Sequence, residues 1–267
     1  MIQEELTTIS LSYFGEYDKT IRVYVPQHDE NEIMPVIYMT DGQNLFEDGH
    51  PHQYGCWFTQ KAVRSEKKSS GKSAIIVGIH NDEGVMRRTN ELTPNSIGKI
   101  KDIEEISEEM KKLLSPEGER FDEFIVNTVM PHIEAIFPAE KGKAAFCGSS
   151  SGGLQSFFTV ISHPDKFCIG GVFSPAFVFY DVNDILRFTA DKMNENMPFL
   201  YIYSGAGDKL EKEICMSTEE VYDALTEFYP PDKMCEVILP EQRHHESAWE
   251  PIFRDFLHTF LERRDEF

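Results

Sequence analysis

Residues 144–153 read AAFCGSSSGG, and they carry the clearest structural signal in the sequence. Its first four residues form a short apolar run, which is typical of a buried β-strand. After it, apolar residues recur at the spacing of one helix face, at Leu154, Phe157, Phe158 and Ile161. A turn rich in glycine and serine therefore joins a buried strand to an amphipathic helix.

The turn contains the pattern G-x-S-x-G, centred on Ser150. Ser150 has Gly148 two positions before it and Gly152 two positions after it, whereas Ser149 and Ser151 lack this pair of glycines. Between a strand and a helix the pattern is typical of a nucleophile elbow, where small neighbours let the strand and the helix approach closely. The sequence therefore predicts that Ser150 is a nucleophile. A loop that binds phosphate is the alternative, but the Gly-Lys-Ser/Thr of a P-loop is missing.

Outward from this turn, apolar strand candidates alternate with amphipathic helix candidates. Strands are predicted at residues 20–25, 35–39, 73–79, 144–147, 169–173, 199–203 and 236–239, and helices at 121–136, 154–161, 221–228 and 252–261. Strands that are apolar throughout need cover on both faces, as parallel strands have. We expect an α/β fold with a mainly parallel sheet and helices on both faces. No repeat or linker divides residues 1–267, so we expect one domain, with residues 99–120 as an exposed helical insertion.

Charge argues against two classes of partner. The chain has 46 acidic and 26 basic side chains, a formal charge of −20. Nucleic-acid phosphates and anionic membranes would both be repelled. The apolar run without a charged residue at 167–180 is too short to span a bilayer.

Cysteine usage and the N-terminal residues favour a reducing compartment. The five cysteines are odd in number and none forms a CxxC pair, which argues against a disulfide framework or a structural zinc site. Residues 1–5 carry acids where a signal peptide would carry Lys or Arg. We therefore expect a cytoplasmic protein. His50 and His52, near Asp48, could suggest a metal, but Pro51 favours a loop here, and no metal is expected.

A nucleophilic serine needs an imidazole to take its proton and a carboxylate to hold that imidazole. After a nucleophile elbow these follow in the order acid, then histidine. His163 and His258 lie in or at the ends of predicted helices, whereas His244 and His245 lie on a loop after the strand at 236–239. The spacing alone leaves both members of this pair open as the base.

The acid and the oxyanion hole are predicted from their positions after strands. Asp208 is the first carboxylate after the strand at 199–203, with Glu211 and Glu213 as alternatives; an Asp in such a turn can also cap a helix. Two backbone N–H groups must bind the oxyanion of a tetrahedral intermediate. We expect them from Ser151, at the start of a helix, and from Gln43, on the loop after the strand at 35–39.

Five stretches resemble a known family. They are residues 38–46 (YMTDGQNLF), 77–94 (VGIHN with a later RTNELTP), 148–153 (GSSSGG), 173–177 (FSPAF) and 244–249 (HHESAW). By these motifs the chain, from about residue 21 to 260, is similar to the putative esterase family of α/β hydrolases. That family includes enterochelin-esterase-like enzymes, feruloyl-esterase-like enzymes and mycolyltransferases.

The resemblance implies an α/β-hydrolase fold with an eight-stranded sheet, a serine hydrolase mechanism and no cofactor. It selects His244 as the base, because the histidine of this motif lies five residues before Trp249. It also implies that Arg88 and Glu91 form an ion pair that frames the site. The chain departs from the family in having Arg243 where glycine is common, and Asp208 where the acid is frequently Glu.

The predicted site is therefore a triad of Ser150, Asp208 and His244 with the Gln43 and Ser151 amides as oxyanion hole. The candidates for substrate binding are Asp41, Asn44, Arg88 and Phe177, although Phe177, like Trp57 and Phe58, could equally pack in the core. We predict a serine esterase that hydrolyses a small-molecule carboxylic ester. An acyltransferase with the same triad is the alternative, and a binding module without catalysis is a third. The sequence does not indicate the acyl group, the alcohol or the oligomeric state.

Overall fold

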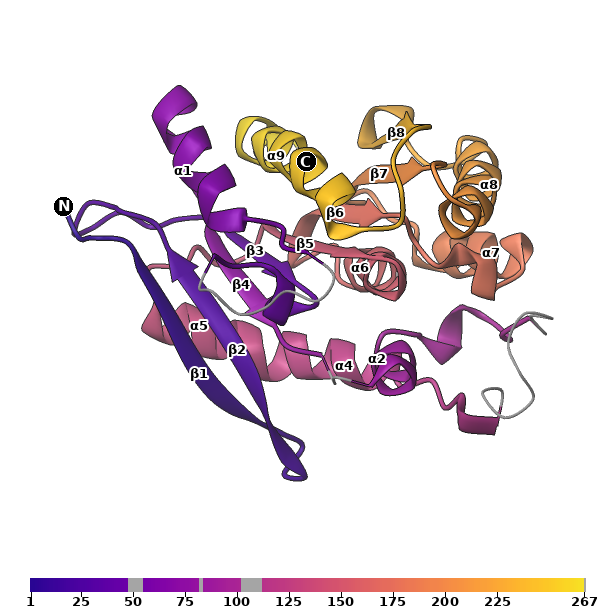
Figure 1. Cartoon of the computed structure of the whole chain (residues 1–267), viewed down its shortest axis with the longest axis horizontal. Helices are drawn as coiled ribbons and strands as arrows, with labels where there is room; N and C mark the ends of the chain where they lie inside the picture. The colour runs from indigo at the N-terminus through magenta and orange to yellow at the C-terminus, as the bar shows by residue number, and fades with distance from the viewer. Residues whose placement is uncertain (48–54, 82–83, 102–111, 267) are drawn as a thin grey trace.

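The computed structural model describes residues 1–47, 55–81, 84–101 and 112–266. These residues form an eight-stranded sheet in the order β1-β2-β4-β3-β5-β6-β7-β8 (Figure 1). β2 runs antiparallel to both of its neighbours, and β3 to β8 are parallel. The strands are β1 Glu5–Tyr13, β2 Tyr17–Val25, β3 Val36–Met39, β4 Ile75–Ile79, β5 Ala144–Ser149, β6 Phe167–Phe173, β7 Phe199–Gly205 and β8 Met234–Leu239.

The predicted α/β-hydrolase fold with a mostly parallel sheet is confirmed. All seven predicted strands are present, each within a few residues of the predicted bounds. The sequence analysis missed β1, which pairs with β2 along its whole length. A signal was available, because Ile9, Leu11 and Tyr13 alternate with polar residues as in a half-exposed strand.

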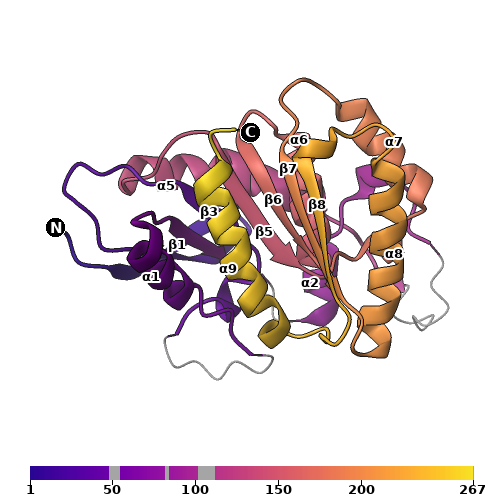
Figure 2. The same ribbon diagram turned by 90° about the horizontal axis from the view of Figure 1, so that it is seen from above.

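Helices cover both faces of the sheet (Figure 2). On one face, α1 packs against α9. The opposite face carries the longer series from α4 to α8, with α2 beside α4. The helices are α1 Thr59–Ser70, α2 Val85–Glu91, α4 Gly118–Phe124, α5 Met130–Ile136, α6 Ser151–Ser162, α7 Val182–Lys192, α8 Lys209–Leu225 and α9 Glu246–Arg263. Short 3-10 turns lie at η1 Gly42–Asn44, η2 Asn95–Ile97, η4 Phe177–Phe179 and η5 Pro231–Lys233.

The helix predicted at 121–136 contains a π-helical turn, Ile125–Val129, between α4 and α5. Pro131 lies in the first turn of α5. Proline has no N–H to donate to the preceding turn, and the wider π turn lies just where the regular hydrogen-bond ladder is interrupted. The insertion predicted at 99–120 falls partly on residues 102–111, outside the described residues.

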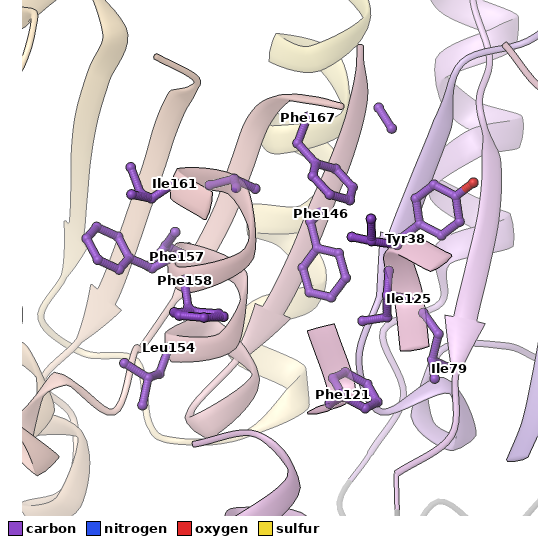
Figure 3. Close-up of a cluster of buried hydrophobic side chains, with 14 of the residues drawn as sticks. Tyr38, Ile79, Phe121, Ile125, Phe146, Leu154, Phe157, Phe158, Ile161 and Phe167 are labelled. Atoms are coloured by element: carbon purple, nitrogen blue, oxygen red, sulfur yellow. The ribbon is translucent and has the colours of Figure 1, made fainter. Parts of the chain in front are cut away.

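Two apolar cores fill the space between the sheet and its helices. On the α4–α8 side, Phe146 of β5 and Phe167 of β6 meet edge to face, with ring centroids 5.8 Å apart (Figure 3). Side chains of α6 and of the helix at 118–136 close over them: Leu154, Phe157, Phe158, Ile161, Phe121 and Ile125. The core on the other face is built by α1 and α9. Because both faces are packed, the parallel strands are held rigidly, and their carboxyl ends meet along one edge of the sheet.

Candidate active site

Ser150 occupies the turn between β5 and α6. Its backbone has φ 60° and ψ −125°, a conformation that costs a non-glycine residue about 1–3 kcal/mol. The Ser150 N–H donates to Phe173 O (3.0 Å), and the Ala176 N–H donates to Ser150 O (3.1 Å). These bonds fix the strained turn against the end of β6. The strand–turn–helix context expected around Ser150 is therefore present.

The glycines of the motif are required by close packing. A Cβ on Gly148 would lie 2.4 Å from Gly152 O, and a Cβ on Gly152 would lie 2.3 Å from Thr40 Oγ1. Real Cβ atoms do not approach other atoms so closely. The elbow thus packs directly on the loop that follows β3. The close approach that the glycines of the motif predicted is present.

The loop after β3 carries the predicted oxyanion donor Gln43. Asp41 adopts a left-handed conformation (φ 55°), and the chain then forms the turn η1. Gly42 packs on the backbone of β4: a Cβ there would lie 2.5 Å from the carbonyl carbon of Gly78. Within the described residues, neither the Gln43 nor the Ser151 N–H donates to a protein acceptor. Both amides lie just beyond the ends of neighbouring strands, β3 and β5: Gln43 in η1, and Ser151 as the first residue of α6.

Arg88 is paired with Asp41, whereas the sequence analysis expected Glu91 as its partner. Arg88 forms a two-pronged contact with the Asp41 carboxylate (Nε–Oδ1 2.5 Å, Nη2–Oδ2 2.7 Å) and reaches Ser149 O at 3.3 Å. Glu91 instead accepts a hydrogen bond from Asn81 Nδ2 at 2.7 Å and pairs with Lys19. Arg88 was predicted to frame the site. Its partner Asp41 lies on the loop after β3, and not on α2, the helix that carries Arg88.

His244 lies on the loop after β8, and its ring faces Glu211. His244 Nδ1 and Glu211 Oε2 are 2.5 Å apart, and the Glu211 side chain is fully buried. Asp208, the predicted acid, does not contact the ring; its Oδ2 accepts the backbone N–H of His244 at 3.0 Å. The structure thus differs from the sequence-based assignment and favours the alternative, Glu211.

The physical reason is that Asp208 is engaged as a helix cap. Asp208 is the N-cap of α8, and its Oδ1 accepts the Glu211 N–H at 2.9 Å. The Glu211 and His244 amides together hold the pKa of Asp208 below its usual value. An acidic N-cap followed three residues later by Glu is a capping signature, and this signal could have moved the prediction from Asp208 to Glu211.

Three donors surround the Glu211 carboxylate. Besides His244, it accepts the Gly205 N–H (2.7 Å) and the Ser174 hydroxyl (2.5 Å). Ser174 Oγ in turn accepts the indole N–H of Trp249 at 2.9 Å, and the Trp249 ring meets the His244 ring edge to face. A buried carboxylate needs such donors, because burying a polar group without hydrogen bonds is costly. Sequence reasoning did not assign Ser174 or Trp249 a role, although both lie in motifs that it had singled out.

Glu246, at the start of α9, connects the His244 loop to the oxyanion loop. Its Oε1 accepts a hydrogen bond from Asn44 Nδ2 at 3.2 Å. Burial raises the pKa of Glu246 to about 7, and the nearby Asp41 carboxylate adds to the rise. Arg88 opposes it, but the charge of Arg88 is already matched by Asp41. Glu246 is therefore a carboxyl whose charge is disfavoured inside the folded protein.

We expect Glu246→Gln to stabilise the protein at pH 8 and to leave its stability nearly unchanged at pH 5. A carboxyl whose pKa rises from 4.5 to about 7 on folding loses up to roughly 3 kcal/mol of stability as the pH rises between those values. Glutamine keeps the size and the acceptor but carries no charge to lose. Urea unfolding of both proteins at pH 5, 6, 7 and 8 measures the difference.

Glu250→Gln is the matched control for this prediction, because Glu250 lies on the same helix in a surface pair with Arg254. Its effect should be small and nearly constant over this pH range. A stability difference between Glu246→Gln and the parent that does not grow with pH would contradict the raised pKa of Glu246.

The remaining predicted residues separate into site and core. Asn44 and Arg88 are partly exposed, whereas Phe177 is 1% exposed and packs edge to face on Phe157. Trp57 is also buried and stacks on Phe173. The prediction that Phe177 binds substrate is therefore wrong. Phe177 and Trp57 both pack in the core, which was the alternative interpretation of these two side chains. The metal pair considered at His50 and His52 lies outside the described residues.

Two further findings concern the whole chain. The five cysteines all lie in the described residues and all are free thiols. Among those residues, no helix combines the length and apolar content that crossing a bilayer requires.

Comparison with known families gives this geometry a context. The profile of the esterase family, described as "Putative esterase", matches residues 15–181. That range is well over half of the chain and includes the oxyanion loop, Arg88 and the elbow. The chain belongs to this esterase family. As a member it is an enzyme of the carboxylic ester hydrolase class, and the family predicted from its motifs is confirmed. A search of curated proteins found no match to this chain.

Solved structures share the fold of this esterase over nearly its whole length. An IroE-like serine hydrolase from Shewanella oneidensis superposes with TM-score 0.72 at 17% identity, over 96% of this chain and 80% of that one. The siderophore hydrolase EstB from Aspergillus nidulans gives 0.68 at 18% identity, over 98% and 96%. A ferulic acid esterase from Anaeromyces mucronatus gives 0.66 at 18% identity, over 97% and 91%. At these identities the likeness concerns the fold.

Proposed function

We propose that this esterase hydrolyses its ester through an acyl-enzyme formed on Ser150, with His244 as the base and Glu211 as the acid of the triad. One observation carries the proposal: a serine in a strained turn after β5 and a buried His244–Glu211 pair at the ends of β7 and β8 belong to the same edge of the sheet. The strain supports a functional role for the serine, because such backbone conformations concentrate at active sites.

In the first step Ser150 Oγ attacks the ester carbonyl carbon while His244 Nε2 takes the hydroxyl proton. Glu211 accepts the Nδ1–H of the ring, so Nε2 is the nitrogen free to act as base. The imidazolium that forms is stabilised by the carboxylate 2.5 Å away. Ser174 and Gly205 keep that carboxylate oriented by donating hydrogen bonds to it.

The negative charge that develops on the carbonyl oxygen needs two donors. The Gln43 and Ser151 amides fit this task, because Ser151 begins α6 directly after Ser150, Gln43 lies in η1 at the end of the neighbouring strand β3, and both lack a protein acceptor among the described residues. Each such donor typically contributes about 10²–10³ in turnover. His244 then protonates the leaving alcohol, and a water molecule, activated in the same way, hydrolyses the acyl-enzyme to the free acid.

The former substrate-binding candidates take different roles in this proposal. Asp41 is buried and holds the oxyanion loop through Arg88, Asn81 and its own backbone. Arg88 and Asn44 retain exposed atoms beside the elbow and are the groups that a bound ester can reach. Arg88 thus joins the loop after β3, through Asp41, to the elbow, through Ser149 O.

A screen of esters tests the proposed function. We expect p-nitrophenyl acetate, methyl ferulate or a siderophore ester to be hydrolysed, with free acid and alcohol released in equal amounts and kcat/KM of about 10⁴ M⁻¹s⁻¹ or more for the best class. The acyl classes follow the names of the structural neighbours. Products that carry the acyl group on an added alcohol, with little free acid, would favour the acyltransferase alternative. Failure to turn over any ester, together with failure of a fluorophosphonate to label the folded protein, would contradict catalysis altogether.

A further inference from the structure

Helices α1 and α9 lie side by side on the face of the sheet away from α6 (Figures 1 and 2). Three side chains that can ligate a metal come together from these two helices. Glu66 belongs to α1, and His258 and Glu262 belong to α9. One ligand atom from each of the three lies within 4.8 Å of the other two. None of the three residues takes part in the proposed triad or oxyanion hole.

The geometry of this cluster is close to that of a zinc site. In tetrahedral Zn²⁺ sites the bonds to nitrogen and oxygen are about 2.0–2.2 Å long, which puts neighbouring ligand atoms roughly 3.4 Å apart. His258 Nδ1 and Glu66 Oε1 are 3.1 Å apart already. His258 and Glu262 are four residues apart on one helix and therefore share a face. A rotamer adjustment of Glu262, which is 40% exposed, brings the third ligand into place.

The donor set also selects among metals. One imidazole and two carboxylates suit Zn²⁺, whereas Mg²⁺ and Ca²⁺ prefer sites made of oxygen alone. Lys72 competes for the third ligand, because its ammonium lies 2.9 Å from Glu262 Oε2. The excess of acidic residues over the whole chain raises the local concentration of cations.

We propose that Glu66, His258 and Glu262 bind one Zn²⁺ ion, with water as the fourth ligand, and that the ion fastens α1 to α9. The site is separate from the proposed ester chemistry. Its effect is on stability, because a ligand that binds the folded chain alone stabilises it. Since α9 begins at Glu246, directly after the His244 loop, fastening this helix also restrains the segment that carries the proposed base.

Calorimetric titration of the whole protein with Zn²⁺ tests the site. We expect binding in the micromolar range, and at a hundredfold excess over Kd a rise in Tm of roughly 5–10 °C that EDTA reverses. His258→Ala should remove one equivalent of bound Zn²⁺ and abolish most of the Tm rise. Lys72→Ala should tighten binding several-fold, because it frees the Glu262 carboxylate. Mg²⁺ at the same concentration should have no effect on Tm.

His132→Ala is the matched control, since it removes a histidine from α5, on the other face of the sheet. It should leave both the stoichiometry and the Tm rise unchanged. His258 is 57% exposed, so its substitution is not expected to disturb folding. Equal Zn²⁺ stoichiometry in the parent and in His258→Ala, or weaker binding in Lys72→Ala, would overturn the proposal.

Discussion

Replacing Ser150 by alanine should lower kcat for p-nitrophenyl acetate by about 10⁴–10⁶ and leave KM within a few-fold. Loss of the nucleophile removes the covalent route entirely, and what remains comes from binding and the oxyanion hole. The backbone conformation at this position is fixed by Phe173 and Ala176, so the fold should persist. Steady-state kinetics and a thermal unfolding curve measure the two effects separately.

Ser151→Ala is the matched control for the nucleophile. Ser151 is the next residue in the chain, and its proposed part in catalysis is played by its backbone N–H, which alanine keeps. Its activity should stay within tenfold of the parent. If Ser151→Ala lost as much activity as Ser150→Ala, or if Ser150→Ala kept more than a few per cent, the choice among the three serines would be wrong.

Replacing Glu211 by glutamine should lower kcat by about 10³–10⁴. Glutamine is isosteric, but it is neutral and cannot stabilise the imidazolium that forms at His244 when the serine gives up its proton. Asp208→Asn should lower kcat by less than tenfold. Asp208 binds the backbone N–H of His244 and not its ring, and asparagine is also a good helix cap. Kinetics of both variants at pH 8 make the comparison.

The two acid variants together decide which carboxylate serves the base. Glu211 is fully buried and also binds Ser174 and Gly205, so its replacement could disturb the fold. Near-UV circular dichroism and Tm are therefore measured to establish that Glu211→Gln is folded. A larger loss of kcat in Asp208→Asn than in folded Glu211→Gln would restore the sequence-based assignment of Asp208.

The sequence was informative where the signal is local. Apolar runs predicted seven of the strands, and the glycines around Ser150 predicted the elbow, because both depend on residues close in the chain. His244 was selected only through the resemblance to the esterase family. The spacing could not separate it from His245, which in the structure caps α9 through Ser247.

Contacts between distant loops were not predictable in this way. Asp208 and Glu211 lie within one turn of each other, and the path of the chain after β7 decides which one faces His244. That path depends on Gly205 and Gly207, where a Cβ would collide with the carbonyl groups of Gln242 and Glu241. Arg88 likewise binds Asp41, which lies 47 residues away in the chain. Such choices are made by tertiary packing, which a single sequence does not display.

Mass spectrometry of the acyl-enzyme is the sharpest test of Ser150 as the nucleophile. The protein is mixed with p-nitrophenyl acetate, quenched in acid within the first turnover, and digested for peptide mapping. The proposed mechanism predicts one acetyl group, on Ser150, in step with a burst of p-nitrophenol, and a much smaller amount in Ser150→Ala. An acetyl group on another side chain, or a burst of product without any acetyl group on Ser150, would contradict it.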